Sequence, residues 1–184
     1  MSRADLARDP CTVARAAELL GDPWTLLILR ELFLGARRFD DFQRQTGGSP
    51  HLLSQRLKRL EADGVVRRRR YSLRPPRDEY RLTEKGRDLW PVVAALKGWG
   101  DRWLADDVGI DAPDEEFGPK TMRLVHRSCG APALPRMACA ACGEPMTARD
   151  SVVEVSPAWA EARAARARAP RGTRPSGSGS SGTG

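Results

Sequence analysis

The stretch from Ser49 to Gly64 constrains the fold of this chain more than any other part of the sequence. Ser49 suits the cap position of a helix, and Pro50 suits its first turn, where an N–H would have no partner in any case. Gly64 is a typical stop residue. Leucines recur at helical spacing between these ends and form one apolar stripe: Leu53, Leu57 and Leu60, with Leu52 at its edge. Alone, the stretch predicts an ordinary amphipathic surface helix.

A strongly basic segment follows this helix. Residues 67–70 are four consecutive arginines, and more arginines flank Pro75-Pro76. We expect strands over about 66–71 and 79–82, with the two prolines at the tip because proline is incompatible with strand pairing. A run of charge is usually a solvated face, and that reading stands for residues 67–70 taken alone. A helix followed by a basic hairpin, however, is the outline of a recognition helix with a wing.

Charge is concentrated in this part of the chain. The 184 residues carry a formal net charge of +7, and the sequence pI is about 9.8. Residues 49–82 contain ten Lys or Arg against four Asp or Glu, a net +6, so most of the excess lies on the helix and hairpin. This distribution favours a polyanionic partner.

The residues before Ser49 predict three helices. Asp9-Pro10 or Thr12 opens the first, whose apolar face is Val13, Ala16, Ala17 and Leu20. Residues 26–34 are apolar almost all round, which predicts a buried helix at the centre of the core. A short third helix begins near Phe39 and ends at Gly47-Gly48, which lead directly into the helix at Ser49. Two helices joined by a tight Gly-containing turn fit helix-turn-helix packing.

A long helix is expected after the hairpin, capped by Thr83 and running from about 84 to 104. Pro91 lies inside it and predicts a kink or a break near Leu89. Its apolar positions again have helical spacing: Leu89, Val92, Val93, Leu96, Trp99 and Trp103. We interpret this helix and the first one as a dimer interface.

Several classes of protein are disfavoured. No apolar run reaches the roughly 18 residues that a membrane span needs, and residues 1–10 lack the apolar core of a signal peptide. We therefore expect a cytoplasmic protein without a membrane partner, in which four cysteines are free, metal-bound or redox-active rather than disulfide-bonded. A nucleophile–base pair, a phosphate loop and a pair of carboxylates near a strand end are all missing, so we do not expect an enzyme.

The sequence resembles the HxlR family of winged helix-turn-helix transcriptional regulators from Cys11 to about Val108. The residues that carry the resemblance are Cys11, 21–32, 35–39, 53–64 and 75–83. The resemblance implies a homodimer that binds double-stranded DNA, with a recognition helix (49–63) from each subunit in the major groove. It also implies that the wing (66–82) lies near the backbone or minor groove, and that the first and last helices join the subunits. The effector ligand stays unknown.

Base reading requires donors and acceptors that project from a helix into the major groove, whereas wing arginines neutralise phosphates. Gln55 can pair with adenine, Lys58 with guanine, and Ser54 or His51 with several base edges. Arg56 lies closer to the apolar side and is expected to contact the backbone or the protein itself. The full set of expected DNA contacts is Ser49, His51, Ser54, Gln55, Lys58, Arg59, Arg74 and Arg77.

Four possible metal ligands cluster after the winged helix. His126, Cys129, Cys139 and Cys142 form an HxxC pair and a CxxC pair, and two knuckle-like turns, 129–130 and 142–143, could present them to one structural zinc per subunit. Some extended family members have a similar tail. The alternatives are a metal-free tail with free thiols, a zinc-ribbon module that recruits another protein, and a thiol–disulfide protein that uses the CxxC pair. The last is disfavoured because no βαβ pattern surrounds the motif.

Cys11 is a candidate redox or electrophile sensor. It precedes or begins the first helix, where the positive end of the helix dipole favours a thiolate. Some family members sense thiol-reactive compounds through a cysteine at the matching position. The alternative is a small buried side chain that only packs.

The expected fold is mainly α with a small β-hairpin wing, a small zinc-ribbon-like segment and a disordered tail. The expected divisions are an arm (1–10), the winged helix domain (11–108), a linker (109–120), the Cys/His segment (121–156) and a low-complexity, disordered tail (157–184), of which 158–169 are Ala/Arg-rich and could be transiently helical.

Overall fold

The computed structural model describes residues 3–74, 76–104, 122–133 and 136–168. The chain divides into two compact units, 1–147 and 148–184. The expected linker, 109–120, lies outside the described residues. Among the described residues, no helix combines the length and apolarity that crossing a membrane demands.

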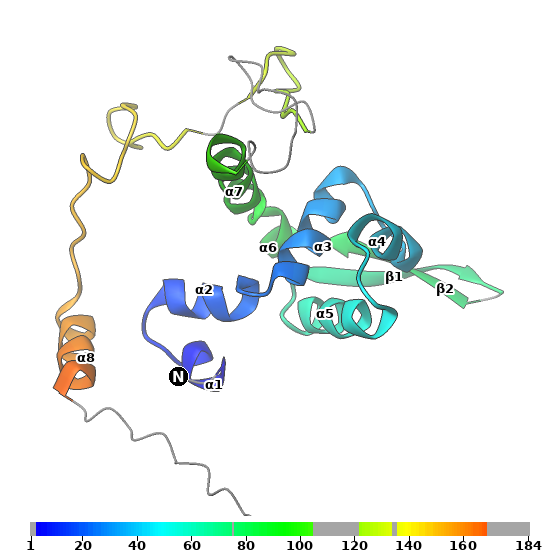
Figure 1. Ribbon diagram of the computed structural model, residues 1–184, viewed down its shortest axis with the longest axis horizontal. Helices are drawn as coiled ribbons and strands as arrows, with labels where there is room; N and C mark the ends of the chain where they lie inside the picture. Colours follow the sequence, from blue (N-terminus) through cyan, green and yellow to red (C-terminus); the bar gives the residue numbers. More distant parts are fainter. Residues whose placement is uncertain (1–2, 75, 105–121, 134–135, 169–184) are drawn as a thin grey trace, which may run out of the picture. The chain divides into compact units, whose positions relative to one another are not determined.

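Helix α3 (Pro23–Leu34) is the centre of the first unit (Figure 1). Asp22 caps it by accepting a hydrogen bond from the Thr25 N–H at 3.1 Å, and Gly35 ends it with a φ of 105°. The helix contributes Ile28, Leu29 and Leu32 to a fully buried core, as expected for its nearly continuous apolar sequence. The rest of this core comes from later elements: Phe42, Leu53, Leu57, Leu60, Val65 and Val66.

Helices α4 (Phe39–Thr46) and α5 (Pro50–Ala62) form the expected helix-turn-helix pair. Gly47 has a φ of 70°, which favours glycine. Gly48 is buried, and a Cβ there would lie 2.9 Å from Leu53 Cδ2 and 3.0 Å from Trp24. Two different constraints therefore explain the two glycines: the first needs an unusual backbone angle and the second needs space.

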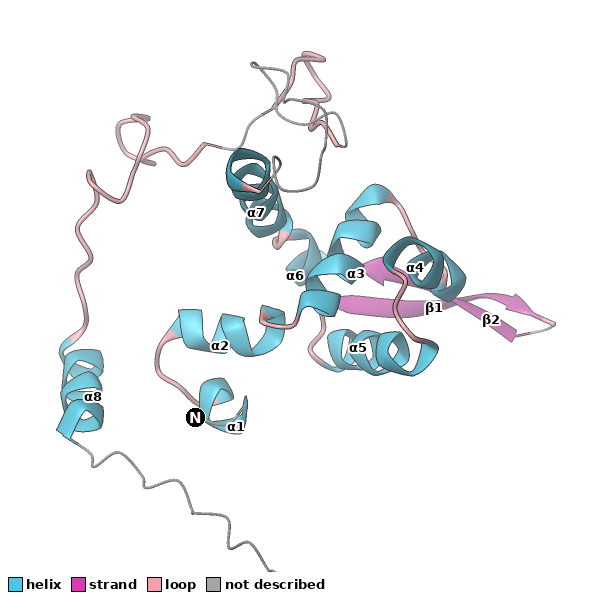
Figure 2. Cartoon of the chain, viewed as in Figure 1, coloured by secondary structure: helices cyan, strands magenta, loops and turns pink. Residues whose placement is uncertain are grey.

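Strands β1 (Val66–Leu73) and β2 (Pro76–Leu82) form an antiparallel hairpin whose tip projects beyond the helices (Figure 2). Both strands are longer than the sequence predicted, and Pro76 is not part of the tip but pairs with Leu73. Proline is tolerated there because it is the first residue of its strand, where its missing N–H is not needed. A shift of register between Arg70 and Ser72 leaves Tyr71 as the extra residue.

The long C-terminal helix is interrupted where Pro91 predicted a break. Thr83 caps α6 (Glu84–Arg87) through the Gly86 N–H, and α7 (Trp90–Trp103) begins three residues after α6 ends. Only Ala94 of α7 is buried, so most of the predicted apolar stripe is exposed or half-buried in a single chain. The confirmed break separates a short capping turn from a helix that meets the core through Val93 and meets Phe33 through Trp90, and leaves the rest of its large apolar side chains exposed.

Three helices lie toward the ends of the described chain. Helix α1 (Arg3–Ala7) lies in the predicted arm, and α2 (Thr12–Leu20) follows with Cys11 at its cap position. None of the α2 side chains is buried. In the second unit, α8 (Pro157–Arg168) covers most of the Ala/Arg-rich residues for which the sequence allowed a transient helix, because alanine and arginine are strong helix formers. Residues 169–184 lie outside the described residues.

Candidate nucleic-acid interface

The two faces of α5 have opposite environments. Leu53, Leu57 and Leu60 are buried in the core, whereas Pro50, His51, Gln55 and Lys58 are exposed on the other side. Ser49 caps the helix as predicted, because its hydroxyl accepts a hydrogen bond from the Leu52 N–H at 3.3 Å. The core therefore fixes the direction in which the polar side chains project.

Two of the predicted base-reading residues form a hydrogen bond with each other. His51 Nε2 and Gln55 Nε2 are 2.9 Å apart, one helical turn along the exposed face. Ser54 is half-buried beside them, and Lys58 is exposed without a hydrogen bond or ion pair among the described residues. The face thus presents hydrogen-bonding groups of several kinds, including a cation that no carboxylate neutralises.

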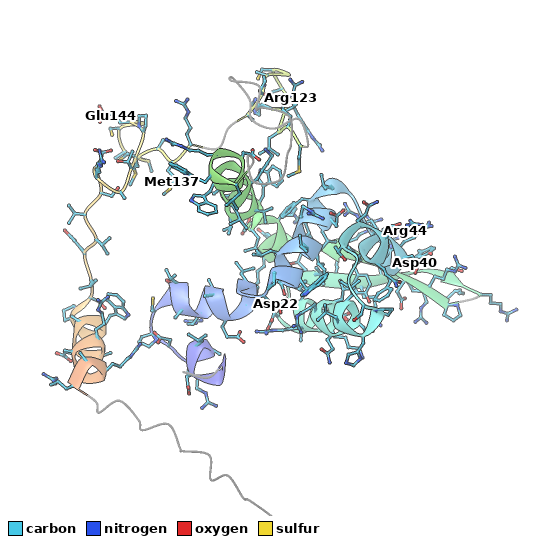
Figure 3. The ribbon with its side chains drawn as sticks, in the orientation of Figure 1. Asp22, Asp40, Arg44, Arg123, Met137 and Glu144 are labelled. Atoms are coloured by element: carbon cyan, nitrogen blue, oxygen red, sulfur yellow. The ribbon has the colours of Figure 1, made fainter. Side chains whose placement is uncertain are left out.

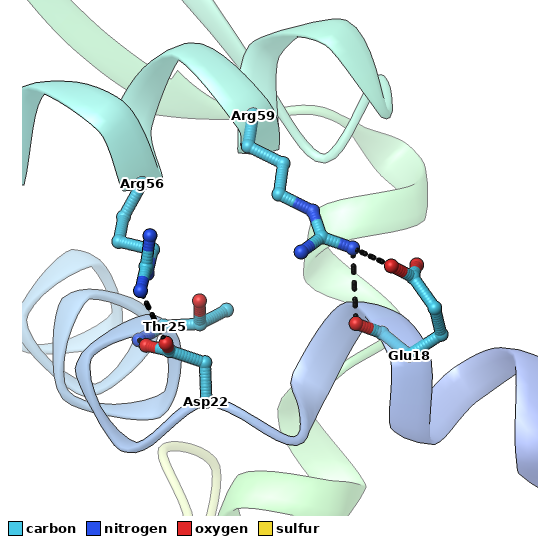
Figure 4. Close-up of polar contacts among 5 residues, drawn as sticks. All are labelled: Glu18, Asp22, Thr25, Arg56 and Arg59. Carbon is cyan, nitrogen blue, oxygen red and sulfur yellow. Dashed lines mark hydrogen bonds and ion pairs between the residues drawn. The ribbon is translucent and has the colours of Figure 1, made fainter. Parts of the chain in front are cut away.

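The two arginines of α5 form ion pairs with carboxylates of the protein itself (Figure 4). Arg56 Nη2 lies 2.6 Å from Asp22 Oδ2, which agrees with the expectation of an intraprotein contact. The hydrogen bond from Arg56 lowers the pKa of Asp22, and the Thr25 N–H acts in the same direction. The pKa of Arg56 is raised for the reciprocal reason.

Arg59 also faces the protein, although the sequence suggested a DNA contact. Its Nη2 donates to the Glu18 carbonyl oxygen at 3.0 Å and to the Glu18 carboxylate, and its Nε lies 3.5 Å from Asp63 Oδ2. The Arg59 side chain is only 26% exposed. These contacts favour a role in holding α5 against α2, and contact with DNA stays a prediction.

Along β1, arginines that pair with a carboxylate alternate with arginines that have no such partner. Arg68 lies 3.6 Å from Glu61 and 3.8 Å from Asp78, and Arg70 donates to Asp78 at 3.1 Å. This contact lowers the pKa of the Asp78 carboxyl. In contrast, Arg67 and Arg69 are exposed and have no such partner in the described part of the chain. Alternate residues of a strand point to opposite faces, so one face of the hairpin is neutralised and the other keeps its charge.

The tip adds two exposed cations. Arg74 lies in the turn and Arg77 is the second residue of β2, and the described residues offer neither of them an ion pair. Their position agrees with the predicted phosphate contact, whereas the sequence did not distinguish Arg67 and Arg69 from their neighbours. The sequence could not separate them, because Glu79 lies opposite Arg69 in the hairpin register just as Asp78 lies opposite Arg70, and Glu79 pairs with Arg81 instead.

Helix α4 does not extend this basic surface. Asp40 and Arg44 both lie on its outer side (Figure 3), and Arg44 Nη2 is 2.6 Å from Asp41 Oδ1. Its exposed charges therefore largely cancel. Among the described residues of this region, the exposed cations without an ion pair lie on α5, on the hairpin and at Arg38, the residue before α4, whose guanidinium lies 4.9 Å from the centre of the Tyr71 ring.

Comparison with known proteins identifies this arrangement. The family model described as HxlR-like helix-turn-helix matches residues 19–108. Mb3122 of Mycobacterium bovis, an uncharacterized HTH-type transcriptional regulator, is 45% identical over 146 residues, which are 79% of this chain and 86% of the relative. The chain belongs to the HxlR family. It is therefore a helix-turn-helix transcriptional regulator and not an enzyme.

Solved structures agree with this assignment of the HxlR-family chain. The crystal structure of PA1607, a proposed transcription factor, has a TM-score of 0.68 and 34% identity, and covers 83% of this chain and 99% of its own. PA1374 of Pseudomonas aeruginosa, also a proposed transcription factor, has a TM-score of 0.54 and 34% identity, covering 85% and 99%. These matches, like the 146-residue alignment, extend beyond the 90 residues of the family model.

In this HxlR-family chain, Cys11 is the residue that precedes α2. It is half-buried, its N–H donates to Asp9 Oδ1 at 2.8 Å, and its side chain makes no cap hydrogen bond. The other end of α2 carries Glu18, the partner of Arg59. The helix therefore joins the cysteine to the contact that holds α5, while the reactivity of the thiol stays a prediction.

The predicted metal ligands lie in two turns of the tail. His126 Nδ1 and Cys129 Sγ are 3.3 Å apart in the first, and Cys139 and Cys142 belong to the second. The backbone N–H groups of Cys142 and Ala141 donate to Cys139 and lower its pKa. Within the described residues, no three His, Cys, Asp or Glu side chains are gathered as a metal site.

Proposed function

We propose that this regulator binds double-stranded DNA as a homodimer, with α5 of each subunit in the major groove and the hairpin on the backbone or minor groove. The observation that supports this most is the common exposure of two surfaces: the polar face of α5 and the unpaired arginines of the hairpin. A helix with donors and acceptors reads base edges, and arginines without partners neutralise phosphates.

Specificity, in this proposal, comes from the first three turns of α5. Lys58 donates to guanine, Gln55 pairs with adenine, and His51 and Ser54 contact neighbouring edges. The contact between His51 and Gln55 orients both side chains before DNA arrives. Ser49 keeps its hydroxyl hydrogen for a phosphate, because its oxygen already accepts from Leu52.

Dimerisation accounts for the exposed apolar face of α7. Large side chains on this helix are between 41% and 61% exposed in the single chain: Trp90, Val92, Leu96, Trp99 and Trp103. Monomeric proteins rarely leave such a group of apolar residues in water. A two-fold dimer through α7 and α2 would cover them and set the distance between the two recognition helices.

The experiment that tests base reading compares Lys58→Ala with wild type on DNA from upstream of the protein's own coding region and on random DNA. We expect Lys58→Ala to weaken binding to the specific site by about 1–3 kcal/mol and to leave random DNA nearly unaffected. The matched control, Arg74→Ala with Arg77→Ala, should weaken both DNAs alike. An equal loss on both DNAs for Lys58→Ala would contradict its place on the base-reading face.

We also propose that modification of Cys11 controls DNA release, either by oxidation to a disulfide with a second thiol or by addition to an electrophile. Modification of this residue would disturb the start of α2, and through Glu18 the contact with Arg59 on α5. Diamide or a quinone should release wild-type protein from DNA in a fluorescence anisotropy assay, whereas Cys11→Ser should stay bound. Equal release of both proteins would show that another thiol is responsible.

A further inference from the structure

We propose that the chain binds one zinc ion between two similar turns, residues 124–133 and 137–146, which we call the knuckles. The first knuckle (124–133) provides His126 and Cys129, and the second (137–146) provides Cys139 and Cys142. The site is separate from the DNA-binding surface proposed above and does not depend on it.

Three backbone hydrogen bonds define the first knuckle. The His126 N–H donates to Ala131 O at 2.9 Å, the Gly130 N–H donates to His126 O at 2.8 Å, and the Ala133 N–H donates to Leu124 O at 2.8 Å. A single bridge pairs residues 125 and 132. The result is a closed turn that carries His126 at its entry and Cys129 before its glycine.

The second knuckle repeats every one of these bonds 13 residues later (126 to 139). The Cys139 N–H donates to Glu144 O and the Gly143 N–H to Cys139 O, both at 2.8 Å, while the Met146 N–H donates to Met137 O at 2.9 Å. The bridge between residues 138 and 145 repeats as well. Figure 3 marks this turn by Met137 and Glu144, and Arg123 precedes the first one.

The sequence explains why the same turn forms twice. Both segments contain Cys-Gly-x-Pro, at 129–132 and at 142–145. Gly130 and Gly143 have φ values of 70° and 77°, which other residues rarely adopt. Because the hydrogen bonds of the two knuckles correspond, His126 in the first knuckle is equivalent to Cys139 in the second. The two knuckles therefore offer equivalent pairs of ligands.

Each pair supplies half of a tetrahedral site. His126 Nδ1 is already 3.3 Å from Cys129 Sγ, and the backbone N–H groups that donate to Cys139 would support a metal-bound thiolate in the second knuckle. Three thiolates and one imidazole are a typical ligand set for structural zinc. Because the described residues gather no three ligands, the metal is what would bring the knuckles together.

The exposure of the knuckle side chains also supports a structural zinc site. The described residues of the two knuckles contain no buried side chain, and Cys129 and Cys142 are exposed. A segment this short cannot build an apolar core of its own, and structural zinc commonly replaces one. The absence of a βαβ pattern around the CxxC pair disfavours the thiol–disulfide alternative.

The test uses full-length protein purified under reducing conditions from medium supplemented with zinc. Elemental analysis should find about one zinc per chain, and binding to the metal-free protein should release protons, because the thiols ligate as thiolates. Cys139→Ser should weaken zinc affinity by more than about 100-fold, since even changes outside the ligand shell cost about 10–100-fold. Cys11→Ser is the matched control, because it removes a thiol elsewhere in the chain, and should retain the metal.

A second set of variants tests the equivalence of the knuckles. His126→Cys should retain one zinc and give cobalt the visible spectrum of a four-thiolate site, because residue 126 occupies the place of Cys139. His126→Ala combined with Arg127→His moves the imidazole by one residue and should not retain zinc. Far-UV circular dichroism of the whole chain shows whether each variant still folds.

Several results would overturn the proposal. Wild-type protein that contains no zinc and titrates as four reactive thiols would exclude the site. A metal-free protein with a Cys139–Cys142 disulfide would favour redox chemistry instead. Full zinc affinity in His126→Ala would show that the first knuckle does not contribute its histidine, and the pairing of the knuckles would then be wrong.

Discussion

The two arginines of α5 and two of the hairpin arginines, Arg67 and Arg69, have the same chemistry and opposite surroundings. Arg56 and Arg59 are 20% and 26% exposed and bind carboxylates of neighbouring elements. Arg67 and Arg69 stand in water without a partner among the described residues. Positive charge is therefore used in two ways here: Arg56 and Arg59 fix α5 to the protein, and we propose that Arg67 and Arg69 contact phosphates.

The largest effect should come from removing the more buried of the fixing arginines. Arg56→Ala leaves the Asp22 carboxylate without its guanidinium, and we expect the free energy of unfolding to fall by about 2–3 kcal/mol, as for a lost hydrogen bond to a charged group. Urea denaturation measures the change. Arg67→Ala is the control and should remain within about 0.5 kcal/mol of wild type. Similar losses in both variants would remove the distinction between the two sets.

The next effect concerns DNA and not stability. Arg67→Ala combined with Arg69→Ala should weaken binding to random DNA by about tenfold to 60-fold at 0.1 M salt and lower the salt slope by about 1.8, as expected for two phosphate contacts. Binding measured at several salt concentrations gives the slope. The matched control is Arg68→Ala with Arg70→Ala, whose arginines already have acidic partners. A fall of the slope that is equally large in the control would show that pairing within the hairpin does not decide which arginines meet DNA.

Arg59 sharpens the comparison because it was predicted to contact DNA and is found against Glu18. Arg59→Ala should lower the free energy of unfolding by about 1 kcal/mol, and should leave the salt slope unchanged if the contact with Glu18 persists on DNA. Glu18→Gln removes the ion pair without removing the arginine. A lower salt slope in Arg59→Ala, with an unchanged free energy of unfolding, would show that Arg59 contacts DNA as the sequence predicted.

The smallest expected effect is a pH dependence of the free energy of unfolding at acidic pH. The hydrogen bond from Arg56 holds the pKa of Asp22 below its ordinary value, so the folded state keeps this carboxylate charged more readily than the unfolded chain does. The stabilisation is complete above the unfolded pKa of about 4 and is lost as the pH falls through the folded pKa. Urea denaturation between about pH 6 and pH 3 should show a smaller decline in Asp22→Asn than in wild type. Identical declines would mean that other carboxylates dominate.

Local chemistry explains which features of the fold were predictable. The caps at Ser49 and Thr83, the two glycines before α5 and the break before α7 depend on one or two residues each, and all were confirmed. The ends of the hairpin were less predictable, because proline at the start of a strand and proline in a turn are alike in sequence. Helix α8 lies in the Ala/Arg-rich residues for which the composition allowed a transient helix, because good helix formers without apolar anchors favour a helix but give it little to pack against.

The candidate site was predictable as a surface but not in its pairing. The outer face of α5 follows from the leucine stripe, whereas the partners of Arg59 and Arg68 depend on how α2 and β2 pack beside them. The register of the hairpin, including the extra residue at Tyr71, decides which arginine meets which carboxylate. The repeat of the knuckles was visible in the sequence, where Pro132 and Pro145 extend the similarity around the two Cys-Gly pairs.

The separation of the two faces of α5 makes this helix suitable for engineering. The side chains that we propose to read DNA, His51, Gln55 and Lys58, do not contribute to the buried core. Those that hold the helix in place, Arg56 and Arg59, find their partners in α2 and at the start of α3. A library that randomises only the exposed positions should therefore yield folded regulators with new operator preferences. Transplanting the whole helix from another regulator should fail unless residues 18 and 22 are transplanted with it.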